Sequence, residues 1–431
     1  MKVLVVGNGG REHALAWRAA QSPLADIVYI APGNPGTCKE NKIENVDIDV
    51  KDIQGLVDFA RNAAIDLTIV GPEGPLVAGL VDAFKDAGLR IFGPSKAGAQ
   101  LEGSKSFTKD FLKRHNIPTA AYEVFTMVDE AIAYIKKNGA PIVIKADGLA
   151  AGKGVVVAMT EDEAIEAVKS MLEDNAFGDA GARVVIEEFM KGEEASFIVM
   201  SDTINAVPMA TSQDHKRVGD GDTGPNTGGM GAYSPAPIVT HEVYQKVMER
   251  IIEPTIKGMA DDGIPYCGFL YAGLMIDENG DPRVVEFNCR FGDPETQPIM
   301  LRMTSDLVDL CYRGCEPGGL EGKTCSYNPN PAVGVVLAAE GYPASPRKGD
   351  VISGLDTPLP EYGKIFHAGT VEKDGQVVTN GGRVLCATAM GEDVAEATAR
   401  AYALARNISF NGMFYRKDIA HRALERLKGD K

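Results

Sequence analysis

The sequence predicts a protein of several domains that combines α/β and α+β architecture. Its length of 431 residues is too great for one ordinary domain and favours about three. The first hundred residues alternate strand-like and helix-like segments, which is typical of a parallel sheet with helices on both faces. Later segments order strands and helices differently and predict smaller mixed units.

The N-terminal region is predicted to form a Rossmann-like parallel sheet. Short runs rich in Val, Ile and Leu indicate buried strands at residues 2–6, 27–31, 67–70 and 90–92. Helical patterns separate them, notably at 12–20 and 54–63. Glycine and proline cluster after the strands, at 7–10, 32–36, 71–75 and 93–94. Because the carboxyl ends of strands face the ligand crevice in such sheets, we expect these loops to line a site.

The rest of the chain is predicted to form a central domain and a small β-rich C-terminal domain. A small α+β unit is expected between 123 and 188, with strands at 142–145, 155–158 and 184–187 and a helix at 161–172. A long irregular loop, rich in glycine and proline, is expected at 218–237. Strands at 333–338 and 384–388 and a helix at 394–407 follow a linker at 327–331. We therefore expect domains at 1–103, 104–327 and 328–431.

Composition excludes several classes of protein. The net charge of −16 argues against nonspecific nucleic-acid binding. No run of eighteen apolar residues appears, so we expect no membrane span, and the short apolar N-terminal run does not resemble a signal peptide. The seven cysteines are odd in number and lack a Cys-x-x-Cys pair, which disfavours a disulfide framework or structural zinc. These features predict a cytoplasmic protein.

The glycine-rich segment at residues 7–11 admits two interpretations. A dinucleotide fingerprint would need a third glycine where Glu12 stands, and an acidic residue near 31–33, where none is found. The dinucleotide interpretation therefore fails twice. A glycine turn that opens a helix can bind a phosphate or carboxylate through free N–H groups. A merely tight strand-to-helix turn is the alternative.

A second glycine-rich segment, at residues 145–154, predicts a hairpin that folds over a triphosphate. It differs from a Walker A loop in spacing and in the strand that follows it. Backbone N–H groups and lysines can hold phosphates here. An exposed hairpin with solvated lysines is the alternative, but Lys145 ends an apolar strand, where an unpaired charge is costly. Further on, Glu187 and Glu188 end a strand and suit sugar hydroxyls or a base amino group rather than phosphates; a solvated strand end is the alternative.

Residues 283–295 contain the most specific group of candidate site residues. On a strand, Glu286, Asn288 and Arg290 share one face, with Val285, Phe287 and Cys289 buried opposite. A carboxylate and an amide offer oxygen ligands to Mg²⁺, a hard cation that keeps water or phosphate as its other ligands. Arg290 beside them can bind a carboxylate through two hydrogen bonds. The alternative is an amphipathic edge strand whose polar face is solvated.

Together these segments resemble the ATP-grasp superfamily, and more closely its phosphoribosylamine–glycine ligase family. Residues 290–297 (RFGDPETQ) match that family's signature, and the resemblance extends over the whole chain. It implies an ATP-grasp core of two α+β subdomains, of which 123–190 is a mobile lid. It also implies ATP with Mg²⁺ or Mn²⁺ as cofactors, glycine and 5-phosphoribosylamine as substrates, and a monomer or weak homo-oligomer.

The resemblance assigns roles to individual residues. Lys105, Lys145, Gly152, Lys153 and Gly154 would hold the phosphates of ATP, Glu187, Glu188 and Phe189 would frame the adenine, and Glu194 would bind the ribose. Glu286 and Asn288 would ligate the metal ion. The substrates would lie around Gly9, Gly10, Arg11, Asp214, Lys216, Arg290 and Asp293. Arg290, Lys145 and Lys105 are the candidate catalytic residues.

The implied reaction is activation of a carboxylate as an acyl phosphate, followed by attack of an amine. Lysines, an arginine and metal ligands suit this chemistry, because phosphoryl transfer depends on positioning and charge neutralisation. Three alternatives stay open: a related ligase with another carboxylate or amine, a nicotinamide-dependent oxidoreductase, and a catalytically silent nucleotide-binding module.

Overall fold

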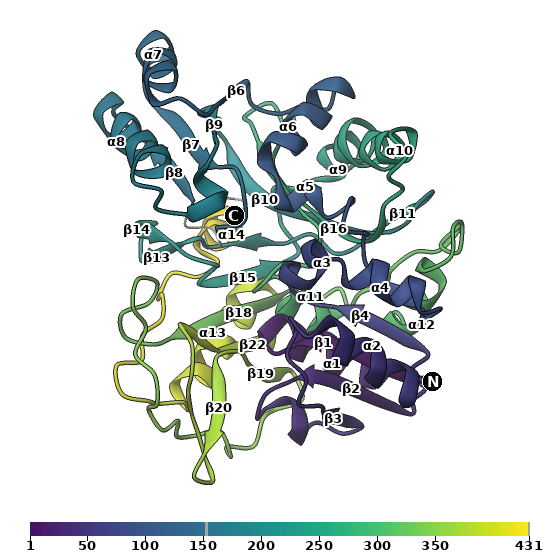
Figure 1. The fold of residues 1–431 in the computed structure, drawn as a ribbon. Coiled ribbons are helices and arrows are strands. Elements are labelled where there is room, and N and C mark those ends of the chain that lie inside the picture. The colour runs from purple at the N-terminus through teal and green to yellow at the C-terminus, as the bar shows by residue number, and fades with distance from the viewer. Residues whose placement is uncertain (151–153, 430–431) are drawn as a thin grey trace.

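The N-terminal sheet is parallel throughout and has five strands in the order β3-β2-β1-β4-β5 (Figure 1). The structure is a computed structural model that describes residues 1–150 and 154–429. The strands are β1 (Lys2–Gly7), β2 (Ile27–Pro32), β3 (Ile43–Asn45), β4 (Leu67–Val70) and β5 (Ile91–Phe92). The helices are α1 (Gly10–Ala20), α2 (Ile53–Asn62), α3 (Glu73–Ala78) and α4 (Leu80–Asp86). The predicted Rossmann-like sheet is confirmed.

Both faces of this sheet are covered by helices, as the alternation along β1 shows. Val3 and Val5 pack in one buried cluster with Leu15 of α1. Leu4 and Val6 point the other way and pack with residues of α2 and α4. Every one of these valines and leucines is fully buried, which explains why the middle of β1 is apolar on both faces.

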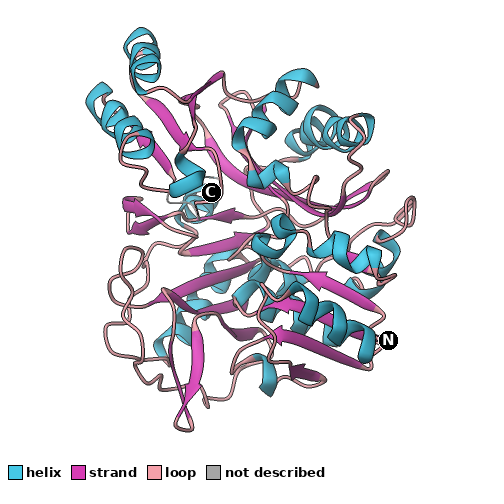
Figure 2. Cartoon of the chain, in the orientation of Figure 1, coloured by secondary structure: helices cyan, strands magenta, loops and turns pink. Residues whose placement is uncertain are grey.

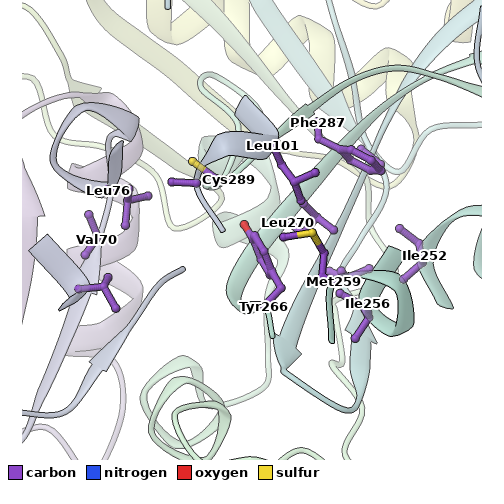
Figure 3. Packing of buried hydrophobic residues seen from close by; sticks show 14 of the residues in the cluster. Val70, Leu76, Leu101, Ile252, Ile256, Met259, Tyr266, Leu270, Phe287 and Cys289 are labelled. Atoms are coloured by element: carbon purple, nitrogen blue, oxygen red, sulfur yellow. The ribbon is translucent and has the colours of Figure 1, made fainter. Parts of the chain in front are cut away.

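A central antiparallel sheet, in the order β11-β10-β16-β17, continues the core of the N-terminal region. Its strands are β10 (Glu193–Asp202), β11 (Ala206–Pro208), β16 (Cys267–Ile276) and β17 (Pro282–Asn288). Figure 3 shows Val70 and Leu76 of the N-terminal region in the same hydrophobic cluster as Tyr266, Leu270 and Phe287. The nearby helices are α5 (Gln100–Gly103), α6 (Lys105–Arg114), α9 (His241–Val247), α10 (Glu253–Asp261), α11 (Thr296–Arg302) and α12 (Leu307–Gly314). A π-helical turn joins α9 to α10.

The predicted α+β unit between 123 and 188 is a separate antiparallel sheet with two helices on it, which we call the outer unit (Figure 1). Its strand order is β6-β9-β7-β8, from β6 (Tyr122–Phe125), β7 (Ile142–Ala146), β8 (Val155–Ala158) and β9 (Val184–Glu188). Its helices are α7 (Val128–Asn138) and α8 (Glu161–Leu172). The unit has its own buried cluster, in which Ile135 and Val168 of the helices meet Ile144 and Ile186 of the strands.

The C-terminal sheet draws strands from two distant parts of the chain, in the order β12-β15-β18-β22-β19. Figure 2 shows the strands in magenta and the helices in cyan, in the orientation of Figure 1. Its strands are β12 (Gln213–Asp214), β15 (Gly231–Ser234), β18 (Ala332–Ala338), β19 (Gly363–His367) and β22 (Arg383–Met390). Helix α13 (Val394–Arg406) packs on it, the hairpin of β20 (Thr370–Lys373) and β21 (Gln376–Thr379) projects from it, and α14 (His421–Gly429) ends the described chain.

The expected irregular loop at 218–237 is wrong. This stretch holds most of the hairpin of β13 (Arg217–Gly219) and β14 (Thr223–Asn226), and then β15. The hairpin turns at Gly221 and Asp222, both with positive φ, and β14 reads Thr-Gly-Pro-Asn with its first three residues exposed. No apolar alternation marks such a strand, so the pairing leaves no local pattern in the sequence.

None of the helices in the described part of the chain has the length and apolar character needed to span a bilayer.

Candidate active site

A cavity of about 780 Å³ lies where the N-terminal region, the outer unit, the central sheet and the C-terminal sheet meet. The structure brings most of the predicted site residues to its wall: Arg11, Lys105, Lys145, Gly154, Glu187, Glu188, Phe189, Glu194, Asp214, Lys216, Glu286, Asn288, Arg290 and Asp293. Gly9 and Gly10 are not among the lining residues. Gly152 and Lys153 lie outside the described residues.

Two lysines share one buried carboxylate at the foot of the outer unit. Glu187 contacts Lys145 Nζ at 2.7 Å and Lys109 Nζ at 2.8 Å. Burial raises the pKa of Glu187, but the two lysines outweigh burial and the net pKa lies below its ordinary value. Lys109 was not predicted. The sequence spacing could have identified it, because Lys109 lies four residues after Lys105 on α6 and therefore on the same helix face.

Lys105 and the start of the glycine hairpin are tied together at the N-terminus of α6. Lys105 Nζ donates to Gly148 O at 3.0 Å, and burial is the main cause that lowers the pKa of this lysine. The Asp147 carboxylate accepts hydrogen bonds from the backbone N–H and the hydroxyl of Ser106, at 2.7 and 2.8 Å. Asp147 therefore has a structural role, because it fixes the hairpin to α6.

Lys216 lies between two carboxylates on the cavity wall. Its Nζ contacts Glu194 at 3.0 Å and Glu286 at 3.6 Å. Burial lowers the pKa of Lys216, but Glu194 and Glu286 outweigh burial and hold it well above its ordinary value. Burial raises the pKa of Glu286, and Lys216 and Lys145 are the largest of the charges that bring it below its ordinary value. Burial also raises the pKa of Asp214 to about 8, although Lys216 opposes the rise.

A β-bulge corrects the predicted pattern of β17. Gly273 pairs with Glu286 and Leu274 pairs with Val284, so Val285 has no partner on β16. The expectation that Val285 is buried opposite Glu286 is therefore wrong, and both residues line the cavity. The bulge also turns the Val285 carbonyl toward Lys145 Nζ, which donates to it at 3.1 Å. The strand ends at Asn288, before Arg290.

Arg290 is held by two carboxylates that were not predicted. Its Nη2 contacts Glu102 at 2.8 Å and its Nε contacts Glu73 at 3.3 Å. Burial lowers the pKa of Arg290, but the two carboxylates outweigh burial and raise it. The Asn288 side-chain amide nitrogen faces two acceptors and donates to Glu102 Oε1 at 2.8 Å. Glu73 begins α3, within the segment 71–75 after β4 that was predicted to line a site.

Asp293 joins the N-terminal region to the C-terminal sheet. Arg383 of β22 donates to the Asp293 carbonyl at 2.8 Å, and Gln297 donates to the Asp293 carboxylate at 2.9 Å. Burial raises the pKa of Asp293, but Arg383 and Arg11 outweigh burial and lower it. Arg383 lines the cavity and was not predicted, although Gly381 and Gly382 precede it directly in the sequence.

The glycines around residues 7–11 make room for the side chain of Glu12. A Cβ on Gly7 or Gly71 would overlap Glu12 Cγ, and Gly7 has a φ of +139°. The Glu12 carboxylate pairs with Arg11 Nε at 2.8 Å in a buried contact. The turn is thus filled by the protein's own carboxylate, and Arg11 is the residue of this loop that reaches the cavity.

Gly71→Ala is expected to lower the free energy of unfolding by about 2 kcal/mol, because the added methyl group displaces the buried Glu12 side chain. Gly74→Ala is the matched control, since a Cβ there meets nothing within 4 Å. Urea denaturation followed by circular dichroism measures both variants. Equal losses in the two variants would contradict this account of the glycine loop.

Comparisons with known proteins agree with this architecture. The chain matches the N domain (residues 1–102), the ATP-grasp (A) domain (103–296) and the C domain (332–422) of the phosphoribosylglycinamide synthetase family. It is 67% identical over 429 residues to the phosphoribosylamine–glycine ligase of Escherichia coli K12, and 65% identical over 426 residues to that of Vibrio parahaemolyticus, covering 99% of every chain compared.

Solved structures give the same result. The crystal structure of phosphoribosylamine–glycine ligase from Thermotoga maritima superimposes with a TM-score of 0.83 at 38% identity, over 97% of this chain and 100% of that one. A biotin carboxylase from Campylobacter jejuni shares the fold alone, with a TM-score of 0.70 at 16% identity over 96% of this chain and 92% of that one. The predicted ATP-grasp core is confirmed, and the chain belongs to the phosphoribosylamine–glycine ligase family.

Proposed function

We propose that this chain joins glycine to 5-phosphoribosylamine with cleavage of ATP, giving glycinamide ribonucleotide, ADP and phosphate. The activity is the one that relatives 65–67% identical over nearly their whole length are named for. The observation that carries the proposal is a cavity in which three lysines, an arginine and two oxygen donors converge from separate parts of the fold: Lys105, Lys145, Lys216, Arg290, Glu286 and Asn288.

The chemistry follows from what the cavity offers. Glycine's carboxylate is a poor acyl donor until the γ-phosphoryl group of ATP converts it to glycyl phosphate. The amine then attacks the carbonyl carbon, the carbon–oxygen bond to phosphate breaks, and the nitrogen loses a proton. Within the described part of the chain no cysteine or serine lines the cavity, which agrees with a reaction that needs positioned charges rather than a covalent nucleophile.

Lys105 and Lys145 are assigned to the phosphates of ATP, together with Gly152, Lys153 and Gly154 of the hairpin. Lys145 is presented by two contacts, with the Glu187 carboxylate and the Val285 carbonyl, so its ammonium group stays in one place. The Glu187 carboxylate is occupied by lysines, and we therefore assign recognition of adenine to the backbone around Glu187 and to Glu188 and Phe189. Glu194 is assigned to the ribose.

Glu286 and Asn288 are assigned to a divalent cation, Mg²⁺ or Mn²⁺. The donor set fits, because a carboxylate and an amide oxygen are hard ligands and both side chains line the cavity beside the phosphate-binding lysines. A bound cation would neutralise charge on the transferring phosphoryl group.

Arg290 is assigned to the carboxylate of glycine. Glu73 and Glu102 hold the guanidinium group at two of its nitrogens. Asp214, Lys216, Arg11 and Asp293 are assigned to the remaining surface of the two acceptor substrates. We assign Gly9 and Gly10 to the turn that presents Arg11.

We infer that the domain limits are 1–103, 104–327 and 328–431, and that 123–190 closes over bound ATP as a lid. The separate hydrophobic cluster of the outer unit supports this, because such a unit can move as one body. We also infer that the protein acts in the cytoplasm as a monomer or weak homo-oligomer, with small molecules rather than nucleic acid or membranes as partners.

The purified chain is expected to release ADP only when ATP, Mg²⁺, glycine and 5-phosphoribosylamine are all present. Alanine in place of glycine is expected to give at least a tenfold lower rate, since one methylene is worth about 1–3 kcal/mol in a close-fitting site. ADP release with another small acid but not with glycine would support a related ligase instead. If no ADP is released under any of these conditions, the protein is a nucleotide-binding module without ligase activity.

A further inference from the structure

The last described segment of the chain returns to the cavity wall. We call residues 416–426 the C-terminal arm; it comprises the start of α14 and the turn before it (Figure 1). Arg416 has no exposed side-chain surface and donates to the Asp222 carboxylate at 3.0 Å and to the Arg217 carbonyl at 3.2 Å. Arg422 contacts Asp222 at 2.8 Å. The arm therefore fastens the hairpin of β13 and β14, which follows Lys216 directly.

A second set of contacts joins the arm to β10. Arg426 donates to both carboxylate oxygens of Glu193, at 2.9 and 2.5 Å. The Gln213 side-chain amide donates to the Glu193 carboxylate and to the Glu194 carbonyl, each at 2.9 Å. Arg426 thus reaches β12 through one intervening carboxylate, and β12 is the strand that leads into Lys216.

A third contact holds the residue next to Lys216. The backbone N–H of Ala420 donates to His215 Nε2 at 3.0 Å, and the His215 side chain is 1% exposed. His215, Asp222 and His421 bring potential metal ligands within 4.8 Å of one another. However, an imidazole that accepts at Nε2 carries its proton on Nδ1 when neutral, and Arg416 and Arg422 already pair with Asp222. The cluster is an anchor and does not suit a cation.

These contacts follow the alternation of an extended strand. The Gln213 amide bonds to Glu193, the partner of Arg426, and His215 accepts from Ala420 of the arm. The alternate residues Asp214 and Lys216 interact with the charges of the cavity. Lys216 itself contacts only Glu194 and Glu286 among the ion pairs of the described chain. Its place is therefore set by the backbone on which it stands.

We propose that the C-terminal arm positions Lys216 for the acceptor substrates, and that Arg426 is a positioning residue that acts through Glu193 and Gln213. The inference rests on the proposed function, in which Lys216 faces those substrates. A small displacement of a group that contacts substrate is enough to lower a rate up to about 10²-fold, so a change outside the cavity can reach the reaction.

Arg426→Met tests the proposal in the full-length chain. The KM for glycine is expected to rise about tenfold while the KM for ATP stays within twofold, and Arg426→Lys, which keeps one charged hydrogen bond, is expected to fall between. Arg313→Met is the matched control, since Arg313 forms a similar half-exposed ion pair with Asp309 on α12. It is expected to leave both KM values within twofold.

Three results would overturn the proposal: an unchanged KM for glycine, an equal rise in both KM values, or the same change in Arg313→Met. A purely structural loss lowers the active fraction, so kcat falls and both KM values stay unchanged. Wild-type enzyme in the same assay separates the two failures. If the proposed function is wrong, wild type shows no glycine-dependent ADP release; if only the arm's role is wrong, wild type is active and Arg426→Met matches it.

Discussion

Glu286→Gln is expected to lower kcat by about 10² to 10³-fold without loss of the fold. The substitution keeps the shape of the side chain but removes the negative charge that we assign to the divalent cation. Among the ion pairs of the described residues, it also leaves Lys216 with Glu194 alone. Steady-state ADP release against Mg²⁺ concentration measures the effect, and the Mg²⁺ concentration for half-maximal rate is expected to rise as kcat falls.

Glu278→Gln is the control for this prediction, because Glu278 is an exposed residue in the turn between β16 and β17. It is expected to keep wild-type kcat and Mg²⁺ dependence. If Glu286→Gln also stays within twofold of wild type in both quantities, the assignment of Glu286 to the metal ion is wrong.

Glu187→Gln is expected to lower the free energy of unfolding by about 3–5 kcal/mol, because it removes the negative charge that two buried lysines contact directly. The side chains of Lys109, Lys145 and Glu187 are 4%, 7% and 3% exposed, so water cannot compensate the loss. Glu188→Gln is the control: the Glu188–Arg283 pair is 45% and 32% exposed and is worth at most about 1 kcal/mol. Urea denaturation followed by circular dichroism compares the two.

Because the same two lysines lower the pKa of Glu187, its contribution to the free energy of unfolding depends on pH. The pKa of Glu187 in the folded protein lies below the 4.5 of a free glutamate. Its contribution is therefore complete above about pH 4.5 and is lost as the pH falls through the folded pKa. Glu187→Gln is expected to reduce the loss of stability in that acid range. An acid-unfolding curve of the same steepness in wild type and variant would show that Glu187 does not stabilise the fold in this way.

The sequence predicts most of the strands of the N-terminal sheet and of the outer unit, because their residues are apolar on the buried faces; glycine or proline follows most strands of the N-terminal sheet. It does not predict the pairing of β15 with β18, since the two strands are about a hundred residues apart and β15 has only four residues. The bulge at Val285 is similarly invisible, because a bulge depends on the partner strand.

The candidate site was predictable where a motif carries it. Glycine loops and the strand with Glu286 and Asn288 lead to the cavity directly. Glu73, Glu102 and Arg383 were missed, because each acts as a partner to another charged side chain and such pairs form only when distant segments meet. Lys109 was missed although its spacing to Lys105 places both on one face of α6. The side chain of Glu12 was missed as well: it fills the space beside Gly7 and Gly71 and pairs with Arg11.

The make-up of the C-terminal sheet limits where this enzyme can be joined to a related enzyme in a chimera. β12 and β15 precede the segment at 327–331, yet they form one edge of a sheet whose other strands follow it. A chimera joined at that segment would leave β18 without its native neighbour and expose an unpaired strand edge, which promotes aggregation. A transferable C-terminal module must therefore include two stretches of the gene, one around codons 213–234 and one from 332 onward.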